Sequence, residues 1–276
     1  MRTSKNKKEC FENQILASAE MGQLAHHTCQ WWGVVLHQAE RFLNAFSAEE
    51  HDPWKATLFV VPERMLLITA IHHALVGLKK LNSELLRYNN PILQPVLTPV
   101  NNIVPIKNFR DLRNMNEHYW EYMVGLGNKK EEFKKTAPQW TIVHGEKDIF
   151  RLGVVNIGEL IVEIKKQSPE VKKITKKIFE WSYVGKALED VLLAGTKEFK
   201  FEFLKDKVTE LATEICFTIH NKDEYIGCIS EYQIEEKIKT VIMRILEQHG
   251  YPSRYQEIIS TLLKCCKDSI KGNANE

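Results

Sequence analysis

The sequence lacks the features that mark several familiar classes of enzyme and membrane protein. It has no glycine-rich phosphate-binding loop, no dinucleotide-binding glycine pattern and no GxSxG nucleophile elbow. No apolar run approaches the roughly 20 residues that a helix needs to cross a bilayer. The polar, basic N-terminus is not followed by the apolar core of a signal peptide. These absences favour a soluble, cytoplasmic protein.

Cysteine usage and net charge exclude further classes. The six cysteines include no CxxC pair, and the adjacent Cys265 and Cys266 suit neither a zinc site nor an unstrained disulfide. We therefore expect free thiols in a reducing compartment. Lys and Arg number 38 against 36 Asp and Glu, which gives a formal net charge of +2. Nucleic-acid binding would consequently require a local basic patch.

The sequence does contain long stretches with helical periodicity. Apolar residues recur at helical spacing over residues 11–46 and again over residues 62–88, with Pro62 in the first turn of the second helix. We expect the two helices to pack antiparallel. The second helix is predicted to bury Leu66, Leu67, Ala70, Ile71, Ala74, Leu75, Leu78, Leu81 and Leu85.

The next segment is rich in proline. Pro91, Pro95, Pro99 and Pro105 predict a long linker without a helix. A helix over residues 108–124, ended by glycines, is expected to pack against both long helices.

The remainder of the chain combines a short extended region with further helices. Residues 140–144 and 149–152, joined by a turn at 145–148, predict a β-hairpin, and a third extended piece near 154–157 is left open. A helix over 158–166 leads to Ser168-Pro169, the N-cap pattern of a separate helix that reaches about residue 194. Two or three helices follow, most clearly over 231–249 and 253–270, with Gly250 and Pro252 between them.

The most informative segment lies in the predicted helix 108–124 and reads Arg113-Asn114-Met115-Asn116-Glu117-His118. An Arg, four residues and a His on a helix resemble the RxxxxH motif of HEPN domains, over roughly residues 11–127. The polar Asn114 and the aromatic and acidic residues after the His add to the resemblance. Trp120 stands where family members often carry Tyr, so no role is assigned to a tyrosine.

The resemblance implies a four- or five-helix bundle that dimerises so that two motifs meet. Many members of the family are metal-independent ribonucleases, and others bind nucleotides or partners without catalysis. The residue types suit RNA cleavage, because His can transfer protons near neutral pH and Arg stabilises charge on phosphate. Arg113 and His118 are therefore the expected catalytic residues, and Asn114 would orient His118 or a phosphate oxygen.

Helix geometry leaves an alternative open. Arg113 and His118 lie about 140° apart around a helix, whereas Asn114 and His118 share a face. The segment could instead be an ordinary polar helix face with Arg113–Glu117 and Arg110–Asn114 pairs.

A basic cluster lies on and before the long central helix: Lys165, Lys166, Lys172, Lys173, Lys176 and Lys177. It could follow an RNA backbone or form a solvated helix face. The pairs His26-His27 and His72-His73 lack metal-site spacing and are expected to be core or surface residues. Trp31-Trp32 is expected to belong to the core or a dimer interface rather than to stack on bases.

The C-terminal third carries a second resemblance. Residues 207–270, with the stop His249-Gly250-Tyr251-Pro252 between two helices, are similar to the helical tail of type I restriction enzyme motor subunits. The resemblance implies docking of a partner protein. The motor and nuclease motifs of that family are absent, so no such activity is implied.

Together these observations predict a mainly α-helical protein. We expect a HEPN-like bundle over residues 1–137, a β-hairpin connector over 138–166 and a C-terminal helical region over 167–276. The expected function is metal-independent RNA cleavage by a homodimer, as a toxin or phage-defence effector, without a cofactor. A protein partner or antitoxin is also expected. The alternative is a non-catalytic HEPN-like interaction module that docks a partner through its C-terminal helices.

Overall fold

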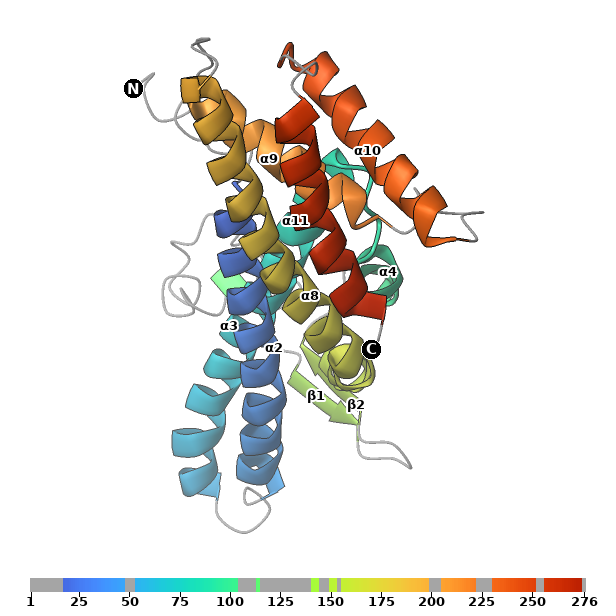
Figure 1. Cartoon of the computed structure of the whole chain (residues 1–276). Helices are drawn as coiled ribbons and strands as arrows, with labels where there is room; N and C mark the ends of the chain where they lie inside the picture. Colours follow the sequence, from blue (N-terminus) through green and yellow to red (C-terminus); the bar gives the residue numbers. More distant parts are fainter. Residues whose placement is uncertain are drawn as a thin grey trace. The chain divides into compact units, whose positions relative to one another are not determined.

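A computed structural model describes residues 17–47, 53–103, 113–114, 140–143, 149–152, 155–198, 205–221, 230–251 and 256–274. The described residues are mainly α-helical, which confirms the predicted fold class at that level (Figure 1). The helices are α2 (Ser18–Ser47), α3 (Pro53–Arg87), α4 (Gln94–Ile103), α8 (Ile157–Glu198), α9 (Lys205–Ile219), α10 (Glu231–Gln248) and α11 (Gln256–Ala274).

The chain forms two compact units, and neither is a continuous stretch of sequence. Unit 1 comprises Met1–Ala25, Leu81–Ile92 and Lys176–Glu276, and unit 2 comprises His26–Lys80 and Leu93–Thr175. The long helices α2, α3 and α8 each contribute residues to both units. Each unit therefore depends on segments that are distant in the sequence.

Within unit 2, α2 and α3 pack antiparallel, as the sequence predicts. The side-chain amide of Gln38 donates to the carbonyl oxygen of Glu63 at 3.1 Å. Nearer the start of α2, the ring of Trp31 stacks on that of His73 with centroids 4.5 Å apart. Positions that come earlier on α2 thus meet positions that come later on α3.

The predicted start of the second long helix, with Pro62 in its first turn, is wrong. Helix α3 begins at Pro53 and contains Pro62 within it. A proline inside a helix costs about 3 kcal/mol through its missing N–H and its ring. Leu66 also departs from the prediction because 52% of its surface is exposed, whereas the other predicted core residues of this helix are buried.

The proline-rich linker contains a helix, contrary to prediction. Helix α4 includes Pro95 and Pro99, and it buries Val96, Leu97 and Val100. Pro95 lies in the first turn, where a backbone N–H has no helical acceptor in any case. The buried apolar face then offsets the local cost of Pro99.

A single helix also replaces the two that Ser168-Pro169 was predicted to separate. Helix α8 runs through Pro169 without interruption. Ile164, Val171 and Ile174 continue one buried stripe across the proline. Pro169 itself is exposed, so the carbonyl oxygen that loses its helical donor can bind water.

Unit 2 also contains three short strands: β1 (Trp140–Val143), β2 (Ile149–Leu152) and β3 (Val155–Asn156). They pair antiparallel in the order β1-β2-β3, with Trp140 opposite Leu152. The turn predicted at 145–148 lies outside the described residues. Strand β3 leads directly into α8, where the side-chain oxygen of Asn156 accepts the backbone N–H of Glu159 at 3.1 Å and caps the helix.

The core of unit 1 includes residues of α9, α10 and α11, of which α10 and α11 are the pair that the sequence predicts most clearly. Helix α10 begins with a reciprocal capping box between Ser230 and Gln233. It is followed by Gly250, whose φ of 70° suits glycine. The hydroxyl of buried Tyr251 then donates to the carbonyl oxygen of Leu192 at 3.0 Å. This bond fixes the turn between α10 and α11 on α8.

Candidate functional site

The RxxxxH segment is only partly described. Arg113 and Asn114 are helical and half-buried, and Nη2 of Arg113 donates to Oδ1 of Asn114 at 2.8 Å. His118 lies outside the described residues, as does the rest of the predicted helix 108–124. This bond links two adjacent side chains of the segment. The predicted roles of Arg113, Asn114 and His118 toward RNA stay predictions.

The basic residues of α8 share one side of the helix. At about 100° per residue, the lysines at 165, 166, 172 and 173 fall within an arc of about 120°. Their side chains are exposed, and the arc lies opposite the buried stripe that contains Ile164, Val171 and Ile174. These residues belong to unit 2, and Lys176 and Lys177 follow on the same helix in unit 1. We call the set at 165, 166, 172 and 173 the lysine face.

Some of these lysines are neutralised and others are not. Lys166 forms an ion pair with Glu163 at 3.4 Å, between exposed or partly exposed groups. Lys165, Lys172 and Lys173 form no ion pair with any residue that the structure describes. Their positive charge is thus available to an anionic ligand. A helix face that only contacts solvent would have the same exposed, unpaired lysines.

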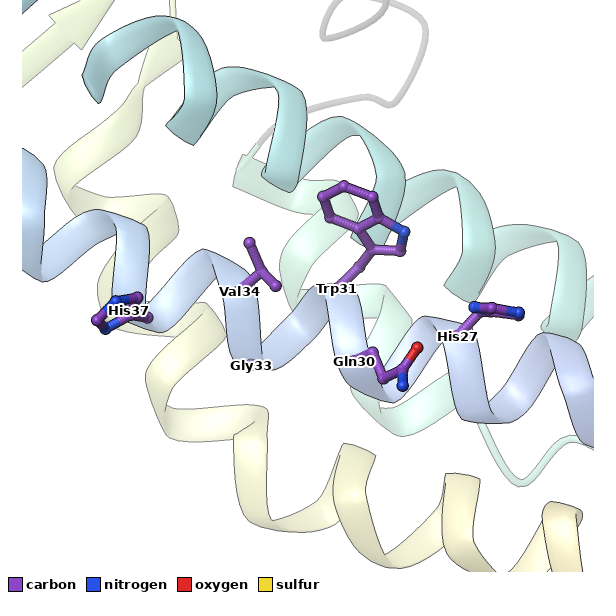
Figure 2. A pocket seen from close by; sticks show the side chains of 6 residues that line it. All are labelled: His27, Gln30, Trp31, Gly33, Val34 and His37. Carbon is purple, nitrogen blue, oxygen red and sulfur yellow. The ribbon is translucent and has the colours of Figure 1, made fainter. Parts of the chain in front are cut away.

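An open hollow of about 690 Å³ on α2 was missed by sequence reasoning (Figure 2). Its lining consists of His27, Gln30, Trp31, Gly33, Val34 and His37. Figure 2 shows that all of these residues come from α2 and that Trp31 turns toward α3, where its ring meets His73. The signal in the sequence was a glycine within a helix, surrounded by polar residues at the spacing of one helix face.

Trp31 and Trp32 differ in their surroundings. Trp32 is 2% exposed, and its indole N–H donates to the carbonyl oxygen of Ile164 at 3.2 Å. Trp31 is half-buried between α2 and α3. Trp32 is a core residue, as predicted, and its bond to Ile164 connects α2 to α8 within unit 2.

Unit 1 contains a histidine that burial has made chemically inert. Nδ1 of His220 donates to the carbonyl oxygen of Cys216 at 2.6 Å, and the ring stacks on Trp181 with centroids 4.6 Å apart. Burial lowers the pKa of His220 to about 4, partly offset by the bond to Cys216. The ring is therefore neutral at pH 7 and serves the core rather than proton transfer.

Cys29, Cys216, Cys265 and Cys266 form no disulfide among the described residues, and Cys10 and Cys228 lie outside them. Burial raises the pKa of Cys216 strongly, so this thiol is not an activated nucleophile.

Another polar contact in unit 1 joins α9 to the end of α10. Nε2 of His249 lies 2.6 Å from Oε2 of Glu214, and both side chains are partly exposed. Tyr88 lies near this carboxylate: burial, Glu84 and Glu214, in that order, raise its pKa well above the usual range. The buried tyrosine therefore stays protonated and does not act as a base.

The described part of the chain contains no group of three His, Cys, Asp or Glu side chains placed to hold a metal ion. None of its helices is both long and apolar enough to span a bilayer. Comparison with protein-family models, curated proteins and solved structures finds no match.

Proposed function

We propose that this protein is a metal-independent endoribonuclease that acts as a homodimer, in the role of a toxin or a phage-defence effector. The observation that carries the proposal is the segment from Arg113 to His118, in which Arg113 is helical and held by Asn114. The guanidinium would bind phosphate oxygens and stabilise the charge that develops on phosphorus. His118 would transfer the protons.

The reaction uses the RNA as its own nucleophile. One histidine takes the proton of the 2′-hydroxyl, whose oxygen attacks the adjacent phosphorus, and the P–O5′ bond breaks. A proton returned to the 5′-oxygen releases a 5′-hydroxyl end and leaves a 2′,3′-cyclic phosphate. One chain supplies a single Arg113 and a single His118, so a second copy would provide the other acid–base group. Activity and dimerisation are therefore coupled.

The lysine face supports RNA as the substrate. Lys165, Lys172 and Lys173 present exposed ammonium groups on one side of α8 without intramolecular ion pairs among the described residues. Basic side chains along a helix bind a phosphate backbone largely through the release of counterions. The face would contribute affinity for RNA but not sequence specificity.

The decisive experiment is cleavage of total RNA by the purified chain in the presence of EDTA. We expect cleavage to persist, because no step requires a metal-bound water. His118→Ala should slow it by about a hundred- to ten-thousand-fold through loss of proton transfer. Asn116→Ala, a polar-to-Ala change in the same segment at a position with no assigned role, is the matched control and should retain activity. Equal activity in all three proteins would contradict the assignment of His118.

Substrate chemistry tests the mechanism independently. RNA with hydrogen in place of the 2′-hydroxyl at the scissile position should bind without being cut. Arg113→Lys should also fail, since an ammonium cannot reproduce the bidentate guanidinium. Cleavage of the modified RNA, or activity that needs added magnesium after EDTA, would point to a metal-dependent nuclease.

Charge reversal tests the lysine face. The double variant Lys172→Glu with Lys173→Glu should weaken RNA binding and reduce the dependence of binding on salt. Lys79→Glu with Lys80→Glu is the matched control, since it reverses two adjacent lysines on α3 in the same unit. Equal losses in both double variants would assign the effect to net charge rather than to this face.

The competing proposal is a non-catalytic module that docks a partner through its C-terminal helices. One observation favours it: Tyr232, in the first turn of α10, is 71% exposed. The apolar side chains of that helix, among them Ile238, Ile242 and Leu246, are already buried in unit 1. Docking would thus use the polar face and Tyr232, and it predicts a homodimer or monomer without RNA cleavage.

A further inference from the structure

The strongest unexplained feature outside the RxxxxH segment is Gly33 on α2. A glycine inside a helix costs up to about 1 kcal/mol relative to alanine. Gly77 in the same unit has a packing reason, because a Cβ there would collide with Thr28. A Cβ on Gly33 would instead meet open space. Among the residues that the structure describes, none approaches Gly33 closely enough to require glycine there.

Gly33 lies within an exposed stripe with the spacing of a helix-packing seam. The stripe alternates steps of four and three residues along α2 and comprises His26, Gln30, Gly33, His37, Glu40 and Asn44. Every one of these positions is exposed, and the stripe extends about 27 Å along the helix. The same spacing brings two helices together in left-handed coiled-coil packing.

We propose that this stripe is the surface through which two copies of the chain associate, with their α2 helices antiparallel about a two-fold axis. In that arrangement His37 of the partner subunit lies over Gly33, where the open hollow has room for a ring. The side-chain amide of Gln30 contacts Nε2 of His26 at 3.0 Å and retains a second N–H, which can donate to Glu40 of the partner subunit. Asn44 of the partner subunit lies opposite His26.

The occupant is a second copy because the stripe is complementary to itself only when reversed. An isologous interface requires that one sequence supply both sides. Antiparallel pairing sets the large His37 against the small Gly33. It also sets the amide of Gln30 against Glu40, the single carboxylate of the stripe. A parallel pair would set Glu40 against Glu40 and Gly33 against Gly33, which gives like-charge repulsion and a void.

The apolar side chains that flank the stripe fit the same arrangement. Val34 is 42% exposed on one flank, and the two-fold axis sets it against Val34 of the partner subunit. Leu43 is 50% exposed on the other flank. Burial of such side chains would supply the apolar contribution that a polar seam lacks.

This inference deepens the homodimer on which the proposed function rests, but it is tested without RNA. Sedimentation equilibrium of the full chain at micromolar concentration should give twice the mass of 32.1 kDa. Gly33→Glu should weaken association by about a hundredfold, as for a residue at an interface centre. The monomer should tolerate this change because Gly33 is exposed and a Cβ there meets open space. Ser83→Glu, an exposed site on α3, is the control and should leave the dimer intact.

Cross-linking gives a second, geometric test. Val34→Cys should form a disulfide-linked dimer when oxidised glutathione is supplied, because the two-fold axis brings the two thiols together. Val76→Cys on α3 is the matched control, with the same residue type and 41% exposure. A monomeric wild-type chain, a dimer unaffected by Gly33→Glu, or equal cross-linking of the two cysteine variants would each overturn the inference. A dimer with these properties that leaves RNA intact would refute the proposed function and retain this surface.

Discussion

Glycine and histidine have opposite surroundings in unit 1 and in the α2 segment of unit 2. In unit 1, a Cβ on Gly22 would collide with Ser182, and a Cβ on Gly185 would collide with Ser18. In unit 2, Gly33 faces open space. His220 of unit 1 is buried against Trp181, whereas the histidines of α2 are exposed.

The difference shows two uses of the same residue types. In unit 1, glycine lets α2 and α8 approach closely, and a neutral histidine satisfies a buried carbonyl group. On α2 in unit 2, Gly33 meets no described side chain at its Cβ position, and His26 contacts its exposed neighbours Gln30 and His27. Both residue types are therefore placed for contact with another molecule. Substitutions in unit 1 and at Gly33 are therefore expected to change the free energy of unfolding by different amounts and in opposite directions.

The largest expected effect concerns acid stability and arises from His220. Its pKa is about 4 in the folded chain, below the ordinary value of 6.5, so the unfolded chain binds more protons between these values. The stabilisation is fully present above pH 6.5 and is lost as the pH falls toward 4. The total is about 3 kcal/mol. Urea unfolding of the wild-type chain and of His220→Asn across pH 4 to 7.5 measures it.

Asparagine can still donate a side-chain N–H near the carbonyl oxygen of Cys216 but does not titrate. The variant should be less stable at pH 7.5, since it loses the stacking on Trp181, and it should depend less on pH. A variant with the same acid sensitivity as the wild-type chain would assign that sensitivity to other groups.

A somewhat smaller loss is expected from Gly185→Ala. The added methyl group would overlap the side chain of Ser18, and overpacking of this kind costs about 1–3 kcal/mol. Adding Ser18→Gly should restore part of the loss, because the backbone N–H of Ser18 that donates to Thr213 at 3.0 Å is kept. Thermal and urea unfolding of the single and double variants measures the coupling. Additive losses would show that the two positions do not collide.

The smallest expected effect has the opposite sign. Gly33→Ala should stabilise the chain by up to about 1 kcal/mol, because alanine is the better helix former and its methyl group meets open space. Urea unfolding at a concentration at which the chain is monomeric measures this intrinsic effect. Destabilisation of the monomer would show that Gly33 has an intramolecular role and would remove the contrast with unit 1.

Much of the helical structure follows from local features of the sequence. The apolar periodicity of α2 and α3 predicts long helices, and their antiparallel packing is confirmed. Ser230, Gln233 and Gly250 lie at the ends of α10, where capping chemistry and a positive φ are decided by neighbouring residues. The residue types of the segment from Arg113 to His118 likewise specify a chemistry that remains a prediction.

Proline shows what only the tertiary structure decided. Pro62, Pro99 and Pro169 all lie inside helices that local rules would have ended or prevented. The local penalty of an interior proline is about 3 kcal/mol or more, whereas a buried stripe gains roughly 1.5–3 kcal/mol for each of several large apolar side chains. That gain depends on neighbours from distant parts of the sequence. The same dependence decides that the lysine face of α8 and the polar stripe of α2 face solvent, because only the packed neighbours determine which side of a helix is covered.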